Sequence, residues 1–316
     1  MISYAWQKTA GPQEERELRE MLAEAAAEDA EAGFPAVSLD QPYRDDAAHL
    51  VVRLLPDGRP GHDASAPVAA YLRVEPDPDG GTATARYVVR PRFRSRGIST
   101  LLLETIGLDL RAEGGWAGTG VSALCIWARG DHPAAQRMAR RFERFGVRPG
   151  RRQWHLLAPL RSGGRPERQG VRARPPAGAA EQAAAAALWH RRAGREELPR
   201  RASVLIAGPD VTGALWYDPD ADERTEYGTA GRIVAVLAEP GREDIRADLV
   251  AAAMTGLRDR GLRVAAITVD ADDHALTRTC RLAGFRHDRT DVEYLVGDVA
   301  AAAPAGAGLA AAEAGR

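Results

Sequence analysis

Residues 86–108 read RYVVRPRFRSRGISTLLLETIGL, and within this stretch an extended pattern changes into a helical one. The preceding TATA and the run RYVV predict a β-strand, because Thr, Val and Tyr bounded by turn residues favour strands. Leu101, Leu102, Leu103 and Ile106 then recur at the spacing of one helix face. The stretch therefore predicts a strand, a turn that contains one glycine, and a helix.

The turn between that strand and helix has the features of an anion-binding site. The first amides of a helix have no intrahelical partner and lie at the positive end of the helix dipole. Gly97 leaves the backbone open to close approach by a ligand, and Arg94 and Arg96 add positive charge. Hydroxyl donors follow at Ser99 and Thr100. Such a turn is suited to a pyrophosphate group.

The chain contains this order of elements twice. In residues 1–160 we predict a helix, three strands, the turn with its helix, a central strand, another helix and a last strand. In residues 181–300 a strand that ends in proline again leads to a helix, a strand and a helix. A linker rich in Gly, Pro and Arg, 161–180, joins the two predicted domains, and a low-complexity tail, 301–316, follows them. We interpret the repeat as an internal duplication.

Composition excludes several classes of protein. A chain of 316 residues with 45% hydrophobic residues is long enough for about two domains. It has no run near the roughly 20 apolar residues that a membrane span needs, and its N-terminus lacks the layout of a secretory signal. The two cysteines lie far apart and the seven histidines show no ligand spacing, so we expect free thiols and no metal site. We expect a cytoplasmic protein with no membrane partner.

The spacing Arg94-x-x-Gly97-x-Ser99 resembles the acetyl-CoA loop of the GNAT N-acyltransferase superfamily, whose usual pattern is Gln/Arg-x-x-Gly-x-Gly/Ala. The resemblance implies an α/β protein with two tandem GNAT-like domains, each a mixed, mostly antiparallel sheet flanked by helices. It implies acetyl-CoA or a related acyl-CoA as co-substrate, with the backbone of Val88 and Val89 pairing with the pantetheine amides. The residues implied for the pyrophosphate are Arg94, Ser95, Arg96, Gly97, Ile98, Ser99 and Thr100.

Two further segments resemble the mycothiol synthases, which are tandem GNAT proteins. They are WARGDHPAAQRMARRFERFGV at 127–147 and DDHALTRTCRLAGF at 272–285. In that family the second half carries the working CoA loop. Here the corresponding stretch, EPGREDIRADL at 239–249, places Ile245 where the glycine is expected. It also places two carboxylates, Glu243 and Asp244, toward a phosphate that they would repel.

The residues that carry the family's acid–base chemistry are also replaced. The general-base glutamate corresponds to Arg86 in the first half and Arg232 in the second. The tyrosine that protonates the leaving thiolate corresponds to Phe142 and Cys280. The resemblance therefore supports the fold and CoA binding in the first half, and it argues against mycothiol synthesis as such.

Replacement catalytic groups are available near the predicted cofactor strand. Glu75, on the preceding strand, is the first candidate for a general base, and His132, in the loop after the central strand, is the second. Tyr87 is a candidate proton donor. A general base adds about 10²–10⁴-fold to a rate, so acyl transfer does not depend wholly on the usual glutamate.

We predict an N-acyltransferase that moves an acetyl or other small acyl group from acyl-CoA to a small-molecule amine bound between the two domains. A non-catalytic acyl-CoA-binding or scaffold protein is the alternative, because both usual base positions hold arginine. A third reading is an acyltransferase that uses aminoacyl-tRNA, since residues 140–174 contain eleven arginines and two glutamates. Lys8 is the only lysine, however, so much of this arginine content follows from coding composition.

Overall fold

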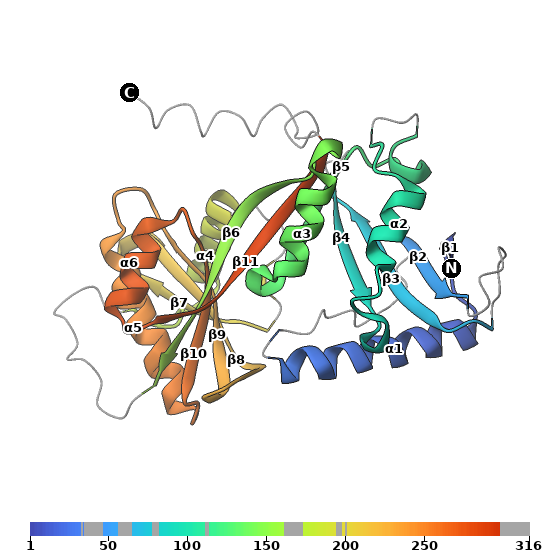
Figure 1. The fold of residues 1–316 in the computed structure, drawn as a ribbon. Helices are drawn as coiled ribbons and strands as arrows, with labels where there is room; N and C mark the ends of the chain where they lie inside the picture. Colours follow the sequence, from blue (N-terminus) through green and yellow to red (C-terminus); the bar gives the residue numbers. More distant parts are fainter. Residues whose placement is uncertain are drawn as a thin grey trace. The chain divides into compact units, whose positions relative to one another are not determined.

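The computed structural model describes residues 1–32, 34, 47–55, 65–77, 82–110, 114–160, 173–193, 198–199 and 201–297. It divides into two compact units (Figure 1). Unit 1 comprises Met1–Arg151 and Val292–Arg316, and unit 2 comprises Arg152–Asp291. The predicted tail, 301–316, lies outside the described residues, as do residues 161–172 of the predicted linker.

Unit 1 is an α/β unit with strand order β1-β2-β3-β4-β5-β11. Neighbouring strands are antiparallel except for β4 and β5, which are parallel. The elements are β1 (Ile2–Gln7), α1 (Pro12–Glu31), β2 (Ala48–Leu54), β3 (Val68–Pro76), β4 (Thr82–Val89), η1 (Pro91–Phe93), α2 (Ile98–Ile106), η2 (Trp116–Gly118), β5 (Ala123–Ala128), η3 (Arg129–Asp131), α3 (Pro133–Phe142) and η4 (Glu143–Phe145), followed by β6 (Arg148–Pro159) and, from the chain's end, β11 (Arg286–Gly297).

Helices cover both faces of the unit 1 sheet (Figure 1). Leu18 and Met21 of α1 pack with Tyr71 and Val88 on one face. On the other face α2 and α3 bury their apolar sides, which include Leu102. Because side chains alternate along a strand, β4 contributes to both cores.

Unit 2 repeats this plan with strand order β6-β10-β9-β8-β7. Its pairs are antiparallel except for β9 with β10. Helices α5 and α6 pack on one core of the sheet, and α4 packs on a second core that contains Trp189 and Trp216. The elements are α4 (Ala179–Ala193), β7 (Ser203–Ala207), η5 (Pro209–Val211), β8 (Gly213–Thr225), β9 (Gly228–Ala238), α5 (Asp244–Asp259), β10 (Val264–Asp270) and α6 (His274–Leu282), with parts of β6 and β11. The fold class is therefore as predicted, a mixed and mostly antiparallel sheet flanked by helices in each unit.

Two strands each contribute residues to both units. Residues 153–159 of β6 pair with β10 in unit 2, although the sequence suggested a first domain that runs to residue 160. Residues 292–297 of β11 pair with β5 in unit 1, although the sequence suggested a second domain that runs to residue 300. The physical reason is burial, because Leu156 joins the core of unit 2 and Val296 joins the core of unit 1.

The two parallel strand pairs diverge in the same way. β4 is paired with β5 only over Thr82–Ala85, and Arg86–Val89 continue in register with β3 alone. In unit 2, β9 is paired with β10 only from Ala230 to Ile233. In each unit, therefore, the last residues of one strand are not paired with the neighbouring parallel strand. These residues come directly before the turn into a helix.

Candidate active site

The turn between β4 and α2 has the backbone geometry of an anion-binding nest. Gly97 caps α2 in the left-handed conformation, with φ 75° and ψ 9°, and Ser95 is also left-handed with φ 60°. A Cβ built on Gly97 would meet no atom within 4 Å, so the backbone at this point is open. Successive turn amides and the first amides of a helix together form a concavity that favours an anion.

The arginines of this turn have different surroundings. Arg94 donates from Nη1 to Oδ1 of Asp29 on α1 at 2.7 Å and from Nε to the carbonyl of Val89 at 3.2 Å. Arg96 is exposed, and its guanidinium carbon lies 5.7 Å from the centre of the Phe93 ring. Positive charge at the surface of the turn therefore comes from Arg96 and the likewise exposed Arg92, whereas Arg94 is engaged in internal contacts.

The two valines before the turn face different cores. The Val88 side chain is buried with α1, and Val89 packs against the core on the other face of the sheet. Both are in register with β3, opposite Tyr71 and Ala70, and lie beyond the last residue of β4 that pairs with β5. The backbone of Val88 and Val89 is thus not paired with β5.

Tyr87 lies on β4 beside the start of α2. Burial raises the pKa of its hydroxyl to about 12, and Ser99 acts in the opposite direction. Within the described part of the chain this buried hydroxyl oxygen has no hydrogen-bond partner of ordinary geometry. The Tyr87 ring packs with the core under α2 and α3.

Glu75 lies on β3 with its carboxylate between two guanidinium groups. Oε1 lies 2.5 Å from Nη2 of Arg73, and Oε2 accepts from Nε of Arg86 at 3.2 Å. Glu75 is opposite Thr84 in the register, so its side chain is on the other face of the sheet from Tyr87. The side chains of Glu75 and Tyr87, the two candidate catalytic residues, therefore lie on opposite faces of the sheet.

His132 is exposed and caps α3. Its Nδ1 accepts a hydrogen bond from the amide of Ala134 at 3.1 Å, and its ring lies 6.0 Å from that of Phe34. Among the described residues, His132 thus contacts a helix end and an aromatic ring and does not meet Glu75 or Tyr87.

The second turn, between β9 and α5, has a different construction. Glu243 is the N-cap of α5 in right-handed helical geometry, and its carboxylate accepts from the amide of Gly241 at 3.3 Å. Ile245, which we expected in the place of the glycine, is the second residue of α5 and is completely buried. That expectation is corrected: the apolar Ile245 side chain belongs to the core, and Glu243 holds the capping position that Gly97 has in unit 1.

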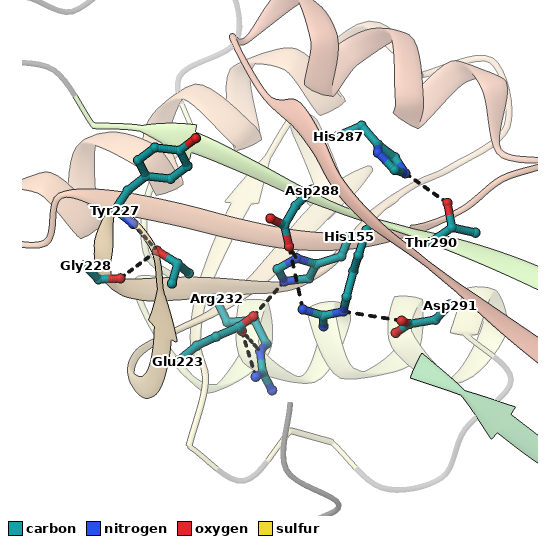
Figure 2. Close-up of polar contacts among 11 residues, drawn as sticks. His155, Glu223, Tyr227, Gly228, Arg232, His287, Asp288, Thr290 and Asp291 are labelled. Carbon is teal, nitrogen blue, oxygen red and sulfur yellow. Dashed lines mark hydrogen bonds and ion pairs between the residues drawn. The ribbon is translucent and has the colours of Figure 1, made fainter. Parts of the chain in front are cut away.

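A polar cluster in unit 2, not anticipated from the sequence, surrounds His155 of β6. Figure 2 shows its imidazole between the carboxylates of Asp288 and Glu223, at 2.9 Å from Nδ1 and 2.6 Å from Nε2. Arg232 donates to Glu223 at 3.0 and 2.8 Å. Both ring nitrogens of His155 therefore lie within hydrogen-bond distance of a carboxylate oxygen. The signal in the sequence is weak, because these residues come from separate strands, β6, β8, β9 and β11.

Glu223 is strongly acidic in this cluster. Burial by itself would raise the pKa of its carboxyl, but the hydrogen bond from His155, its charge and Arg232 together lower it to about 2. Within the described ranges no group of three or more His, Cys, Asp or Glu residues has the arrangement of a metal site. No described helix is both long and apolar enough to cross a bilayer.

The fold is that of the GNAT N-acetyltransferases. The chain aligns with a GCN5-related N-acetyltransferase from Sphaerobacter thermophilus with a TM-score of 0.59 and 20% identity, over 92% of this chain and 95% of that one. It also aligns with a tandem GNAT protein from the clavulanic acid biosynthesis pathway, with a TM-score of 0.61 and 14% identity over 96% and 99% of the two chains. These likenesses establish the fold.

Sequence similarity identifies the family. The chain is 30% identical to a mycothiol acetyltransferase from Nocardia farcinica, over 93% of this chain and 97% of that protein. It is 29% identical to a mycothiol acetyltransferase from Sanguibacter keddieii, over 78% and 80% of the two. No protein-family model matches the chain. The chain belongs to the mycothiol acetyltransferase family.

Proposed function

We propose that unit 1 binds acetyl-CoA, or a related acyl-CoA, at the turn between β4 and α2 and that the protein transfers its acyl group to a small-molecule amine. The observation that carries this proposal is the left-handed Gly97 at the N-terminus of α2, with open space around its Cα. In this proposal the pyrophosphate accepts from backbone amides of the turn and of the first residues of α2. The segment concerned is residues 94–100.

The divergence of β4 from β5 supports the position proposed for the pantetheine arm. Val88 and Val89 have backbone edges beyond the parallel register, and an extended amide-containing chain needs such partners. The half of the ligand that carries the thioester would then lie along β4. The contrast with unit 2 is chemical, since Glu243 and Asp244 at the start of α5 place negative charge where the pyrophosphate would bind.

We propose Glu75 as the general base and Tyr87 as the general acid, with His132 as the alternative base. The amine nitrogen attacks the thioester carbonyl carbon, the C–S bond breaks, and the nitrogen loses a proton to the base. The leaving thiolate takes a proton from the acid. Holding amine and thioester in line contributes roughly 7–11 kcal/mol to such reactions in favourable cases, so positioning carries much of the rate.

The acceptor amine is proposed only as a class. The relatives are named for mycothiol, but arginine occupies the strand position of the family's general base in both halves, at Arg86 and Arg232. This replacement favours an acceptor that differs from the one for which the relatives are named. The location of the amine between the two predicted domains, and the use of aminoacyl-tRNA, stay predictions.

Isothermal titration with acetyl-CoA tests the proposal. We expect one site per chain, and Gly97→Asp should abolish binding because it adds a carboxylate and a strained side chain to the nest. Gly107→Asp is the matched control: Gly107 caps the other end of α2, also with positive φ and no atom within 4 Å of its Cβ position. Absence of binding in the unaltered protein, or equal losses in both variants, would falsify the proposed site.

A second measurement separates an enzyme from a binding protein. Release of CoA thiol from acetyl-CoA is followed while amines of different classes are added. Thiol release that depends on one class of amine identifies the acceptor chemistry. Binding of acetyl-CoA without thiol release for any amine would favour the non-catalytic alternative.

A further inference from the structure

Helix α1 ends with negative charge at its negative pole. Its C-terminal half contains Glu24, Glu28 and Asp29, and its last turn contains no basic residue. Carboxylates near a helix C-terminus are unfavourable, because the last carbonyls already carry partial negative charge. Such a cluster therefore needs compensation from cations on another element.

That compensation comes from the two ends of the turn before α2. Arg90, directly after β4, is 7% exposed and donates to both oxygens of Glu24, at 2.7 and 2.5 Å. Arg94, after η1, contacts Asp29 at 2.7 Å and Glu28 at 3.5 Å. The acidic end of α1 thus holds the turn at two points four residues apart.

Arg94 also joins the turn to the strand that precedes it. Its Nε donates to the carbonyl of Val89, the last residue of β4, at 3.2 Å. The guanidinium therefore bridges α1 and β4, and Ser95 follows with φ 60°. A non-glycine residue in this region is strained, so the conformation of Ser95 needs contacts that maintain it.

We propose that Asp29 is a positioning residue for acyl-CoA binding, which acts through Arg94 to hold Ser95–Gly97 in the geometry that presents their amides to the pyrophosphate. Arg94 then shapes the nest, and the exposed Arg96 supplies charge directly to the phosphate. This inference rests on the proposed function for the role of the nest, but the coupling of Asp29 to the turn is independent of any ligand.

Hydrogen exchange of the ligand-free protein tests that coupling. We expect Asp29→Asn and Arg94→Gln each to accelerate exchange of the hydrogen-bonded amides of the turn by about fivefold, the equivalent of about 1 kcal/mol. These are the amides of Phe93, Arg94 and Leu101, which donate to the carbonyls of Arg90, Pro91 and Gly97. The double variant should exchange no faster than Arg94→Gln alone, because Asp29 acts through Arg94. Glu31→Gln is the control, since it removes an exposed carboxylate from the same helix end. Unchanged exchange in Asp29→Asn, or additive effects in the double variant, would overturn the proposal.

Titration with acetyl-CoA and with acetyl-pantetheine tests the proposed effect of Asp29 on acyl-CoA binding. Asp29→Asn should weaken acetyl-CoA binding by about fivefold and leave its salt dependence unchanged, whereas Arg96→Gln should also reduce the salt dependence. Acetyl-pantetheine, which lacks the pyrophosphate, should bind all variants equally. Tighter acetyl-CoA binding in Asp29→Asn would overturn the inference, because Asp29 would then compete with the phosphate. If the unaltered protein fails to bind acetyl-CoA, the proposed function fails, while hydrogen exchange still decides the coupling.

Discussion

The carboxylate of Glu75 accepts a hydrogen bond from Arg86 across two strands of unit 1, and Glu223 accepts one from Arg232 in the same way in unit 2. Glu75 is opposite Thr84 and Glu223 is opposite Ala230, and each arginine lies two residues further along its strand. In unit 2 a register shift between Asp218 and Glu223 places Asp218 opposite Arg232, whereas Arg73 is opposite Arg86 in unit 1. The duplicated chain therefore contains the pair twice. In both copies the carboxylate lies on the strand next to that of the arginine.

The repeated pair provides a matched test of the proposed base. We expect Glu75→Gln to lower the acetylation rate about 10²-fold with little change in acetyl-CoA affinity, because a base acts on the amine and not on the cofactor. Glu223→Gln removes the corresponding carboxylate from unit 2. The rate per folded molecule should stay within about twofold of that of the unaltered protein. Steady-state kinetics on both variants make the comparison. Equal rate losses would assign the effect to the fold and not to proton transfer.

Tyr87 and Tyr71 form a second matched pair. Tyr71 has its hydroxyl 2.7 Å from Nδ1 of His49, so Tyr71→Phe should lower the free energy of unfolding by about 1–3 kcal/mol. Tyr87 has a buried hydroxyl without such a bond, so Tyr87→Phe should change stability little and lower the acetylation rate about 10-fold or more. Urea unfolding and kinetics are measured on both. A large stability loss with an unchanged rate in Tyr87→Phe would exclude its proposed role.

The cluster around His155 predicts a specific acid sensitivity. The pKa of Glu223 is about 2 in the folded protein, against an ordinary 4.5. Between these values the unfolded chain binds more protons, so stability present above about pH 4.5 is lost as pH falls toward 2. The loss is on the order of 3 kcal/mol at most, at about 1.4 kcal/mol per unit.

Glu223→Gln isolates this contribution from that of the other carboxylates. The difference in unfolding free energy between the unaltered protein and the variant should have its full value above about pH 5 and should shrink steadily below pH 4.5. Urea unfolding at several pH values measures it. A difference that stays constant down to pH 2.5 would contradict the prediction.

Both thiols should be slow to react in the folded protein. Burial raises the pKa of Cys125 to about 11 and that of Cys280 to about 12. The thiolate is the reactive form, so alkylation by iodoacetamide at pH 8 should be slow for both and fast in denaturant. Mass spectrometry after timed labelling measures the rates. Rapid labelling of Cys280 under native conditions would show that its helix opens readily.

The sequence by itself determined the local part of this protein. A strand, a glycine-containing turn and a helix at residues 86–108 follow from residue pattern, and the structure contains β4, η1, Gly97 and α2 in that order. The α/β class, the mostly antiparallel sheets and the acyltransferase family followed from the same local signals and their repetition. These inferences succeed because turn conformation and helix periodicity depend on residues close together in the chain.

Only the tertiary structure decided which distant residues meet. Arg94 contacts Asp29, 65 positions away, and the strands around His155 bring together carboxylates from β8 and β11. The same cause placed Ile245 in the core and divided the residues of β6 and β11 between the two units. Strand pairing and ion pairs between distant segments depend on which apolar faces the whole chain buries together, and a local pattern of residues contains no measure of that choice.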